Sequence, residues 1–175
     1  MLIAKVETPL GDVVAGAVDE GICLCEFSGG NRLEAELDDL KKYLRQEAVE
    51  GENDHIKNIR IQLNEYFAGT RKHFDIPLVT PGTEFQKKVW NELLNIPYGR
   101  TVSYRQQADA LKNPLAIRAV ANANGMNRIS IIIPCHRVIG SDGGLTGYGG
   151  GLHRKKWLLE HEKKHSGMPL NNILF

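Results

Sequence analysis

The chain has 175 residues, of which 42% are hydrophobic and 25% are charged, and a formal net charge of +1. These values are ordinary for a globular protein of one domain or two small ones. No apolar run is long enough to span a membrane, and the first residues lack the basic, apolar and small-residue series of a signal peptide, so we expect neither.

The first half of the chain predicts a mixed domain of strands and helices over residues 1–80. Residues 2–27 contain three short apolar runs separated by turns, which is typical of an antiparallel meander. Apolar residues at helical spacing then predict two amphipathic helices, over 33–49 and 56–69. Residues 72–79 complete this half as a strand or an extended piece.

The second half predicts a mostly helical domain over residues 81–165, followed by an extended tail over 166–175. Thr83 and Ser103 each stand three residues before a glutamine, which is the capping-box pattern that opens a helix. The first of these helices ends at Pro97-x-Gly99 and the second near Leu111. A final helix is expected over residues 153–165.

A tight break at Asn113-Pro114 separates the helix that Ser103 opens from another over residues 115–124. Two short helices joined in this way resemble a helix-turn-helix, whose second helix enters a groove of DNA. From the pattern alone, an ordinary helical hairpin is the favoured interpretation. The second helix is rich in alanine, and Arg118 is the one long charged side chain in its middle.

The small net charge conceals an uneven distribution. Residues 1–81 hold 9 Lys and Arg against 15 Asp and Glu, a net charge of −6, whereas residues 82–175 hold 13 against 6, a net charge of +7. A polyanion such as DNA would therefore bind the second half rather than the first. The alternative is a chance imbalance between two solvated surfaces.

The candidate reactive group is a thiol at the end of an apolar run. Residues 129–133 are followed by Pro134, Cys135 and His136. The proline ends the run, so the thiol follows a rigid, buried support outside any helix interior or central strand. A cysteine becomes a nucleophile as a thiolate, and His136 can act as the base that forms it. Glu162 shares the apolar face of the last helix and can orient the imidazole.

The other cysteines carry no such pattern. Cys23 and Cys25 alternate along a strand, and we interpret them as small apolar core residues. No Cys/His set has zinc-site spacing, so we expect no structural metal and no cofactor. An odd number of cysteines argues against disulfides and favours a cytoplasmic protein. The loop over residues 140–151 has seven glycines but lacks the features of a phosphate-binding loop.

Four segments together resemble the O6-alkylguanine-DNA alkyltransferases, also called methylated-DNA–protein-cysteine methyltransferases. These segments are FQKKVWNELLNIPYGRTVSYRQQA, NPLAIRAVANAN, NRISIIIPCHRVIG and GLTGYGGGLHRKKWLLEHE. They span nearly all of residues 83–162. The resemblance implies an α+β fold, with a ribonuclease H-like N-terminal domain followed by a helical domain with a winged-helix-like helix-turn-helix.

The resemblance also implies a reaction and a role for each site residue. Cys135 takes the alkyl group from O6 of guanine in a flipped nucleotide, once per molecule, and activity on O4 of thymine stays open. The implied catalytic residues are Cys135, His136, Glu162, Tyr104 and Asn127. The implied residues for binding the base or the DNA backbone are Arg118, Tyr148, Arg105, Asn113, Ser141 and Gly149.

Two residues depart from the pattern of the family. Gly149 stands where many relatives carry a serine, which removes a hydroxyl donor near the base. Arg128 stands where a proline often follows the asparagine. The expected partner is double-stranded DNA containing O6-alkylguanine, bound by a monomer away from any membrane. The alternatives are a cysteine hydrolase, a lesion-binding protein without activity, and a plain DNA-binding regulator.

Overall fold

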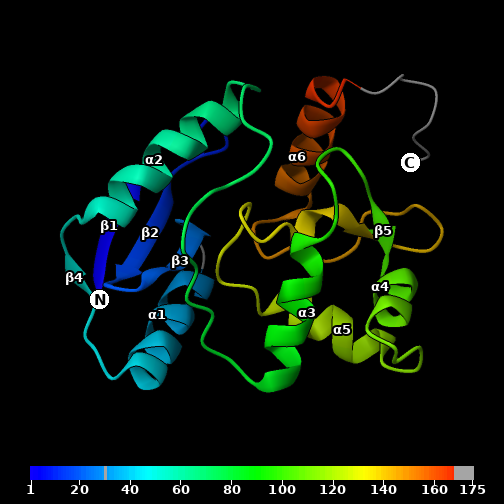
Figure 1. Cartoon of the computed structure of the whole chain (residues 1–175), viewed down its shortest axis with the longest axis horizontal. Helices are drawn as coiled ribbons and strands as arrows, with labels where there is room; N and C mark the ends of the chain where they lie inside the picture. The colour runs from blue at the N-terminus through cyan, green and yellow to red at the C-terminus, as the bar shows by residue number, and fades with distance from the viewer. Residues whose placement is uncertain (30, 168–175) are drawn as a thin grey trace. The chain divides into compact units, whose positions relative to one another are not determined.

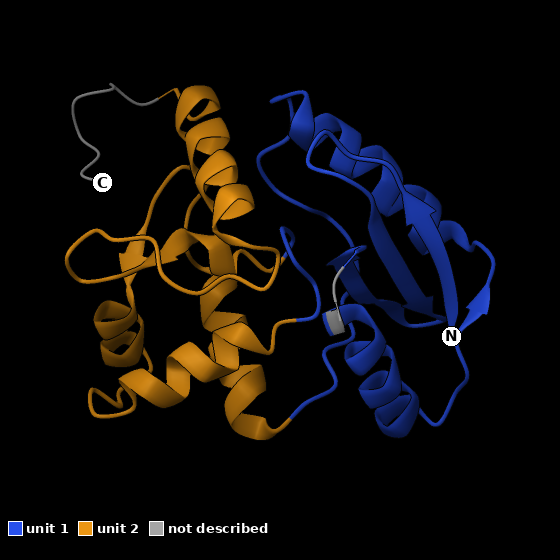
Figure 2. Ribbon diagram, turned by 180° about the vertical axis from the view of Figure 1, so that it is seen from behind, with its two compact units in different colours: residues 1–82, 128–132 blue, residues 83–127, 133–175 orange. Residues whose placement is uncertain are grey.

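The computed structural model of the chain describes residues 1–29 and 31–167. It forms two compact units (Figure 2), one of residues 1–82 with 128–132 and the other of residues 83–127 with those from 133 onward. We call these unit 1 and unit 2, and we call residues 128–132 the strap. Most of the predicted tail lies outside the described residues. Within them, no helix combines the length and apolar character needed to cross a bilayer.

Among its described residues, unit 1 is a four-stranded sheet with two helices (Figure 1). Its strands lie in the order β3-β2-β1-β4; β1 pairs antiparallel with β2, and β2 with β3. The predicted meander is therefore confirmed. The elements are β1 (Leu2–Val6), β2 (Val13–Val18), β3 (Gly21–Phe27), α1 (Asn31–Leu44), β4 (Val49–Glu50) and α2 (Asp54–Phe67).

The helix predicted over 33–49 is too long. Helix α1 ends at Leu44 because Arg45 takes a left-handed backbone conformation, with a φ of 55°. The chain then turns back, and Val49 pairs with Leu2 in a parallel strand that the periodicity did not predict. The expected strand over 72–79 is an extended segment, in which Leu78 forms an isolated bridge with Ile22.

The core of unit 1 contains the two cysteines of β3. Cys23 packs with Val18, Leu24 and Leu40 and has no solvent exposure. Burial raises the pKa of Cys23 to about 11 and holds that of Cys25 well above its usual range. Both therefore stay protonated near neutral pH, which agrees with their interpretation as apolar core residues.

Unit 2 has four α-helices, a two-stranded parallel sheet and one 3-10 turn among its described residues. Both predicted capping boxes are present, with Thr83 and Ser103 accepting from the backbone of the glutamine three residues later. The small sheet was not predicted. The elements are α3 (Glu84–Leu94), β5 (Val102–Ser103), α4 (Tyr104–Ala110), α5 (Ile117–Gly125), the turn η1 (Cys135–Arg137), β6 (Val138–Ile139) and α6 (Leu152–His165).

Two buried polar contacts fix α5 in unit 2. The indole N–H of Trp90 on α3 donates to the carbonyl of Ala123 at 2.8 Å. Gln107 of α4 and Asn124 of α5 exchange amide hydrogen bonds at 2.7 and 3.2 Å. Since buried amides without partners are costly, this reciprocal pair specifies how α4 and α5 cross.

Candidate active site

Cys135 is the first residue of η1, directly after the buried run that the sequence analysis singled out. Its side chain is 9% exposed. The side-chain amide of Asn127 donates to Sγ at 3.2 Å and also to the carbonyl of Ile133 at 2.8 Å. The backbone N–H of Cys135 donates to the same carbonyl at 2.8 Å. The thiol thus faces a fixed hydrogen-bond donor, which favours its charged form.

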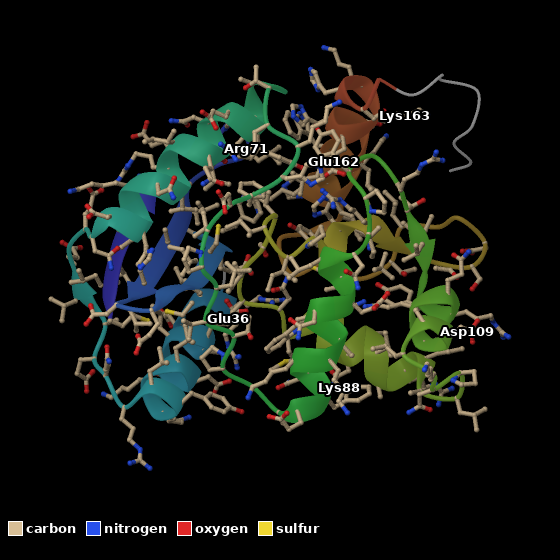
Figure 3. The ribbon with its side chains drawn as sticks, in the orientation of Figure 1. Glu36, Arg71, Lys88, Asp109, Glu162 and Lys163 are labelled. Atoms are coloured by element: carbon tan, nitrogen blue, oxygen red, sulfur yellow. The ribbon has the colours of Figure 1, made fainter. Side chains whose placement is uncertain are left out.

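His136 and Glu162 form a buried pair behind the turn. Nε2 of His136 lies 2.8 Å from Oε1 of Glu162, and both side chains have no solvent exposure, whereas Lys163, the next residue of α6, is partly exposed (Figure 3). Because a carboxylate accepts, Nε2 carries the proton and Nδ1 has a free lone pair. Nδ1 is buried and has no hydrogen-bond partner among the described residues. Burial lowers the pKa of His136, so the ring is neutral at pH 7 and able to accept a proton.

Arg137 is a third member of this cluster, which the sequence analysis missed. Its guanidinium binds Glu162 through two N–H groups, each 2.9 Å from a carboxylate oxygen, and donates to the carbonyl of Ile96 at 2.6 Å. The backbone N–H of Gly99 adds a bond of 3.0 Å to Glu162. Burial acts to raise the pKa of Glu162, but His136 and Arg137 together hold it well below its usual range. Glu162 is therefore charged and held in one orientation.

Lys155 of α6 was not predicted either. It is fully buried, and its ammonium donates to the carbonyls of Val138, Thr146 and Gly147 at 2.6, 2.7 and 3.2 Å. Burial lowers its pKa to about 8, against which the nearby Cys135 acts. The ammonium therefore attaches the glycine-rich loop to β6 and α6 and places a positive charge near the thiol.

Tyr104 and Tyr148 lie beside this cluster. Tyr104 is the first residue of α4, and its hydroxyl donates to the carbonyl of Thr146 at 3.2 Å. The preceding residue, Ser103, pairs with Ile139 across the small sheet, which ties the start of α4 to the segment that follows the thiol. Burial raises the pKa of Tyr104, so it is a neutral donor at pH 7. The ring of Tyr148 stands edge-on to His136, with centroids 6.5 Å apart.

The remaining predicted site residues lie at the surface of unit 2. Each is exposed and none belongs to the buried cluster around Cys135. Their positions suit contacts with a large partner better than chemistry at the thiol. They are Arg105 on α4, Asn113 in the α4–α5 turn, Arg118 on α5, and Ser141 and Gly149 in the glycine-rich loop.

A signal for Arg137 was present in the sequence. An arginine within a continuous apolar run needs a buried anionic partner, and Glu162 was already expected to point inward. No comparable signal marks Lys155. It lies between Arg154 and Lys156 in a basic stretch that is typical of an exposed helix surface. Among the described residues, no cluster of three or more His, Cys, Asp or Glu side chains could hold a metal ion; the expectation of no structural metal stays a prediction.

We expect Lys155→Met to loosen the glycine-rich loop, because three buried carbonyls would lose their charged donor. Amide exchange over residues 144–148 should rise roughly tenfold or more, the equivalent of about one charge-assisted hydrogen bond. Hydrogen–deuterium exchange measures this. Lys156→Met is the matched control, since Lys156 is 66% exposed and pairs only loosely with Glu160. Equal exchange in both variants would contradict the role of Lys155.

A buried thiol with an amide donor and a neighbouring histidine–carboxylate pair is the arrangement that a cysteine nucleophile needs, in a transferase or in a hydrolase. Comparison with known proteins separates these classes. Residues 84–164 match the family model of the 6-O-methylguanine DNA methyltransferase DNA-binding domain.

Curated relatives extend the likeness beyond that domain. A methylated-DNA–protein-cysteine methyltransferase of Methanosarcina acetivorans is 44% identical over 162 residues, covering 93% of this chain and 98% of the relative. One from Mycobacterium tuberculosis is 58% identical over 114 residues, covering 65% of this chain and 68% of the relative. The crystal structure of Mycobacterium tuberculosis OGT in complex with DNA superposes with a TM-score of 0.82 at 39% identity, covering 94% of both chains.

The chain belongs to the methylated-DNA–protein-cysteine methyltransferase family. The resemblance drawn from its sequence motifs is confirmed, and so is the mixed α+β fold class.

Proposed function

We propose that this protein repairs DNA by transferring a methyl or other alkyl group from O6 of guanine to Sγ of its own Cys135, once per molecule. The observation that carries the proposal is the hydrogen-bonded set around the thiol. Asn127 donates to Sγ at 3.2 Å, and the adjacent His136 is bound to Glu162 at 2.8 Å. Family membership supplies the substrate class, since the relatives are named for methylated DNA.

In this mechanism, Nδ1 of His136 accepts the thiol proton, directly or through a water, and Glu162 stabilises the imidazolium. The thiolate attacks the alkyl carbon, an S–C bond forms and the C–O6 bond breaks. The electron pair moves onto the guanine, where the neutral hydroxyl of Tyr104 donates a hydrogen bond or a proton. The product is a thioether. A thioether is stable, so the protein is consumed after one transfer.

The base must leave the duplex to reach a thiol that is 9% exposed. Flipping a nucleotide costs a few kcal/mol. We infer that α4 and α5 act as a helix-turn-helix that approaches the minor groove, with Arg118 filling the gap in the stack. The exposed Arg118 on an alanine-rich helix and the net charge of +7 over residues 82–175 support this interpretation. We likewise infer a ribonuclease H-like form for unit 1 and a winged-helix-like form for unit 2.

We expect Arg118→Ala to slow repair in duplex DNA more than reaction with free O6-methylguanine, because the free base needs no flipping. The duplex rate should fall by roughly ten- to a hundredfold, the cost of losing a few kcal/mol of support for the flipped state. Single-turnover assays on both substrates measure this. Equal slowing on the two substrates would contradict the role of Arg118 in the stack.

The competing hydrolase is tested by the fate of the alkyl group. With a duplex labelled in the O6-methyl group, a transferase leaves the label on the protein in a ratio of no more than one per chain. A hydrolase would release the label into solution and act repeatedly. Label that appears in solution over many equivalents of substrate would overturn the proposed function.

A further inference from the structure

The strap connects two residues that both form hydrogen bonds with Cys135. Asn127, just before the strap, donates to Sγ of Cys135 at 3.2 Å. Ile133, just after it, accepts hydrogen bonds from Asn127 and from the backbone of Cys135 through its carbonyl, at 2.8 Å each. Both residues belong to unit 2, whereas the strap itself belongs to unit 1. Five residues therefore separate the donor to the thiol from Ile133, and all five belong to unit 1.

The backbone of the strap is attached to β3. The N–H of Cys25 donates to the carbonyl of Arg128, and the N–H of Ser130 donates to the carbonyl of Cys25, at 2.8 Å each. The hydroxyl of Ser130 adds a buried bond of 2.9 Å to Glu26. All atoms in these bonds lie in unit 1.

Arg128 anchors the first residue of the strap. Its guanidinium donates to the carbonyl of Pro81 at 2.9 Å and to the carboxylate of Asp39 at 3.1 Å, and it lies 5.6 Å from the centre of the Tyr43 ring. The side chain is only 5% exposed. Arg128 is joined to Asn127 by one peptide bond, so this anchor acts directly beside the donor to the thiol.

The strap is strained where it turns. Ile131 has a φ of 73°, a left-handed conformation that a β-branched side chain adopts only when its surroundings enforce it. Ile131 is buried, with 1% exposure. A strained segment relaxes when its anchors are removed, and relaxation here would move Asn127 or Ile133.

We propose that Arg128 is a positioning residue of the active site, which acts through the strap to keep the Asn127 amide on Cys135. This inference rests on the proposed role of Cys135 as the alkyl acceptor. The side-chain partners of Arg128 are Pro81, Asp39 and Tyr43, so its action on the thiol is indirect. Its effect is on the fraction of molecules in which the thiolate has its hydrogen-bond donor, and so on the pH at which Cys135 reacts.

The test measures the reactivity of Cys135 without DNA. Wild type and variants are alkylated with iodoacetamide over a range of pH, and peptide mass spectrometry follows the Cys135 peptide alone, so Cys23 and Cys25 do not interfere. Asn127→Ala, which removes the donor, should raise the midpoint of the profile by roughly one pH unit or more. Arg128→Met should raise it by at least roughly half a unit, and Arg128→Lys should recover part of the shift.

A second measurement connects the anchor to repair. For Arg128→Met the single-turnover rate constant with saturating methylated duplex should fall roughly three- to tenfold at pH 7, while the dissociation constant for that duplex stays within about twofold. Raising the pH should restore most of the rate. If wild type transfers no methyl group, the proposed function fails, and the iodoacetamide profiles still test the inference by themselves.

Arg71→Met is the matched control. Arg71, labelled in Figure 3, also lies in unit 1 and also binds one carboxylate and one backbone carbonyl. These belong to Glu65 and His73, neither of which is part of the strap. The pH profile of Cys135 alkylation in Arg71→Met should match that of wild type. If Arg128→Met does not fold, Asp39→Asn and Ser130→Ala, which each remove one anchor, carry the same test. The proposal would be overturned if the folded Arg128, Asp39 and Ser130 variants had the same pH midpoint of Cys135 alkylation as wild type. It would also be overturned if Arg71→Met shifted that midpoint equally.

Discussion

Cys135→Ala is expected to abolish repair completely while leaving the binding of methylated duplex within about twofold of wild type. In the proposed mechanism, Sγ is the atom that takes the alkyl group, and the methyl side chain of alanine is not a nucleophile. The side chain is small and 9% exposed, so its loss leaves only a small cavity. Residual O6-methylguanine in the recovered duplex, together with a gel-shift affinity, measures both effects.

The control for this variant is the pair of cysteines in unit 1. The pKa of Cys23 is raised to about 11 by burial, and that of Cys25 is raised further. Replacing either with alanine should therefore leave the transfer rate unchanged. Repair that survives in Cys135→Ala, or that is lost in Cys25→Ala while the fold persists, would show that the acceptor had been assigned to the wrong thiol.

Glu162→Gln should have the next largest effect, on both rate and stability. The amide cannot accept from His136 and from two N–H groups of Arg137 at once, so the imidazole loses its fixed tautomer, at a cost of roughly a thousandfold or more in rate. Arg137, 7% exposed, is left as a buried charge without its carboxylate. Breaking such a pair lowers the free energy of unfolding by about 3–5 kcal/mol. Chemical denaturation and single-turnover kinetics measure these effects.

Glu160→Gln is the matched control, because Glu160 lies on the same helix and its side chain is 57% exposed. It should change the unfolding free energy by no more than about 0.5 kcal/mol. A Glu162→Gln protein as stable as this control would contradict the buried pair as described.

The stabilising contribution of Glu162 should depend on pH in a defined direction. Its pKa in the folded protein is lowered, so the contribution is fully present above the unfolded value of about 4.3 and is lost as the pH falls through the folded value. The pKa of His136 is also lowered, so its burial begins to cost stability below about pH 6.5. The difference in unfolding free energy between wild type and Glu162→Gln should be largest above about pH 5 and shrink in acid.

The features that the sequence predicted well depend on local chemistry. Thr83 and Ser103 predicted the starts of their helices because a capping box involves only residues of the first helical turn. The short apolar runs separated by turns define β1 to β3 in the same way. Cys135, His136 and Glu162 were singled out because a thiol, an imidazole and an inward carboxylate are unusual next to apolar runs. The structure joins His136 to Glu162 at 2.8 Å, and the catalytic roles of all three stay predictions.

What the sequence did not predict depends on contacts far along the chain. Strand β4 consists of Val49 and Glu50, both exposed, and exists because the edge of β1 is available to them. Residues 129–132 of the strap are mostly apolar and carry no sequence signal for a turn. The strained conformation at Ile131 follows from contacts of the strap with residues more than a hundred positions away, such as Glu26. Lys155 has an ordinary helical neighbourhood, and only the loop carbonyls that meet it reveal its burial.

The central claim is that Cys135 accepts one alkyl group and keeps it. The protein is incubated with a tenfold excess of duplex containing O6-methylguanine, digested, and analysed by peptide mass spectrometry. We expect a single methyl increment on the peptide with Cys135, none on the peptide with Cys23 and Cys25, and loss of one lesion per chain with the remainder unrepaired. An unmodified Cys135 peptide alongside repair of the whole excess would contradict it.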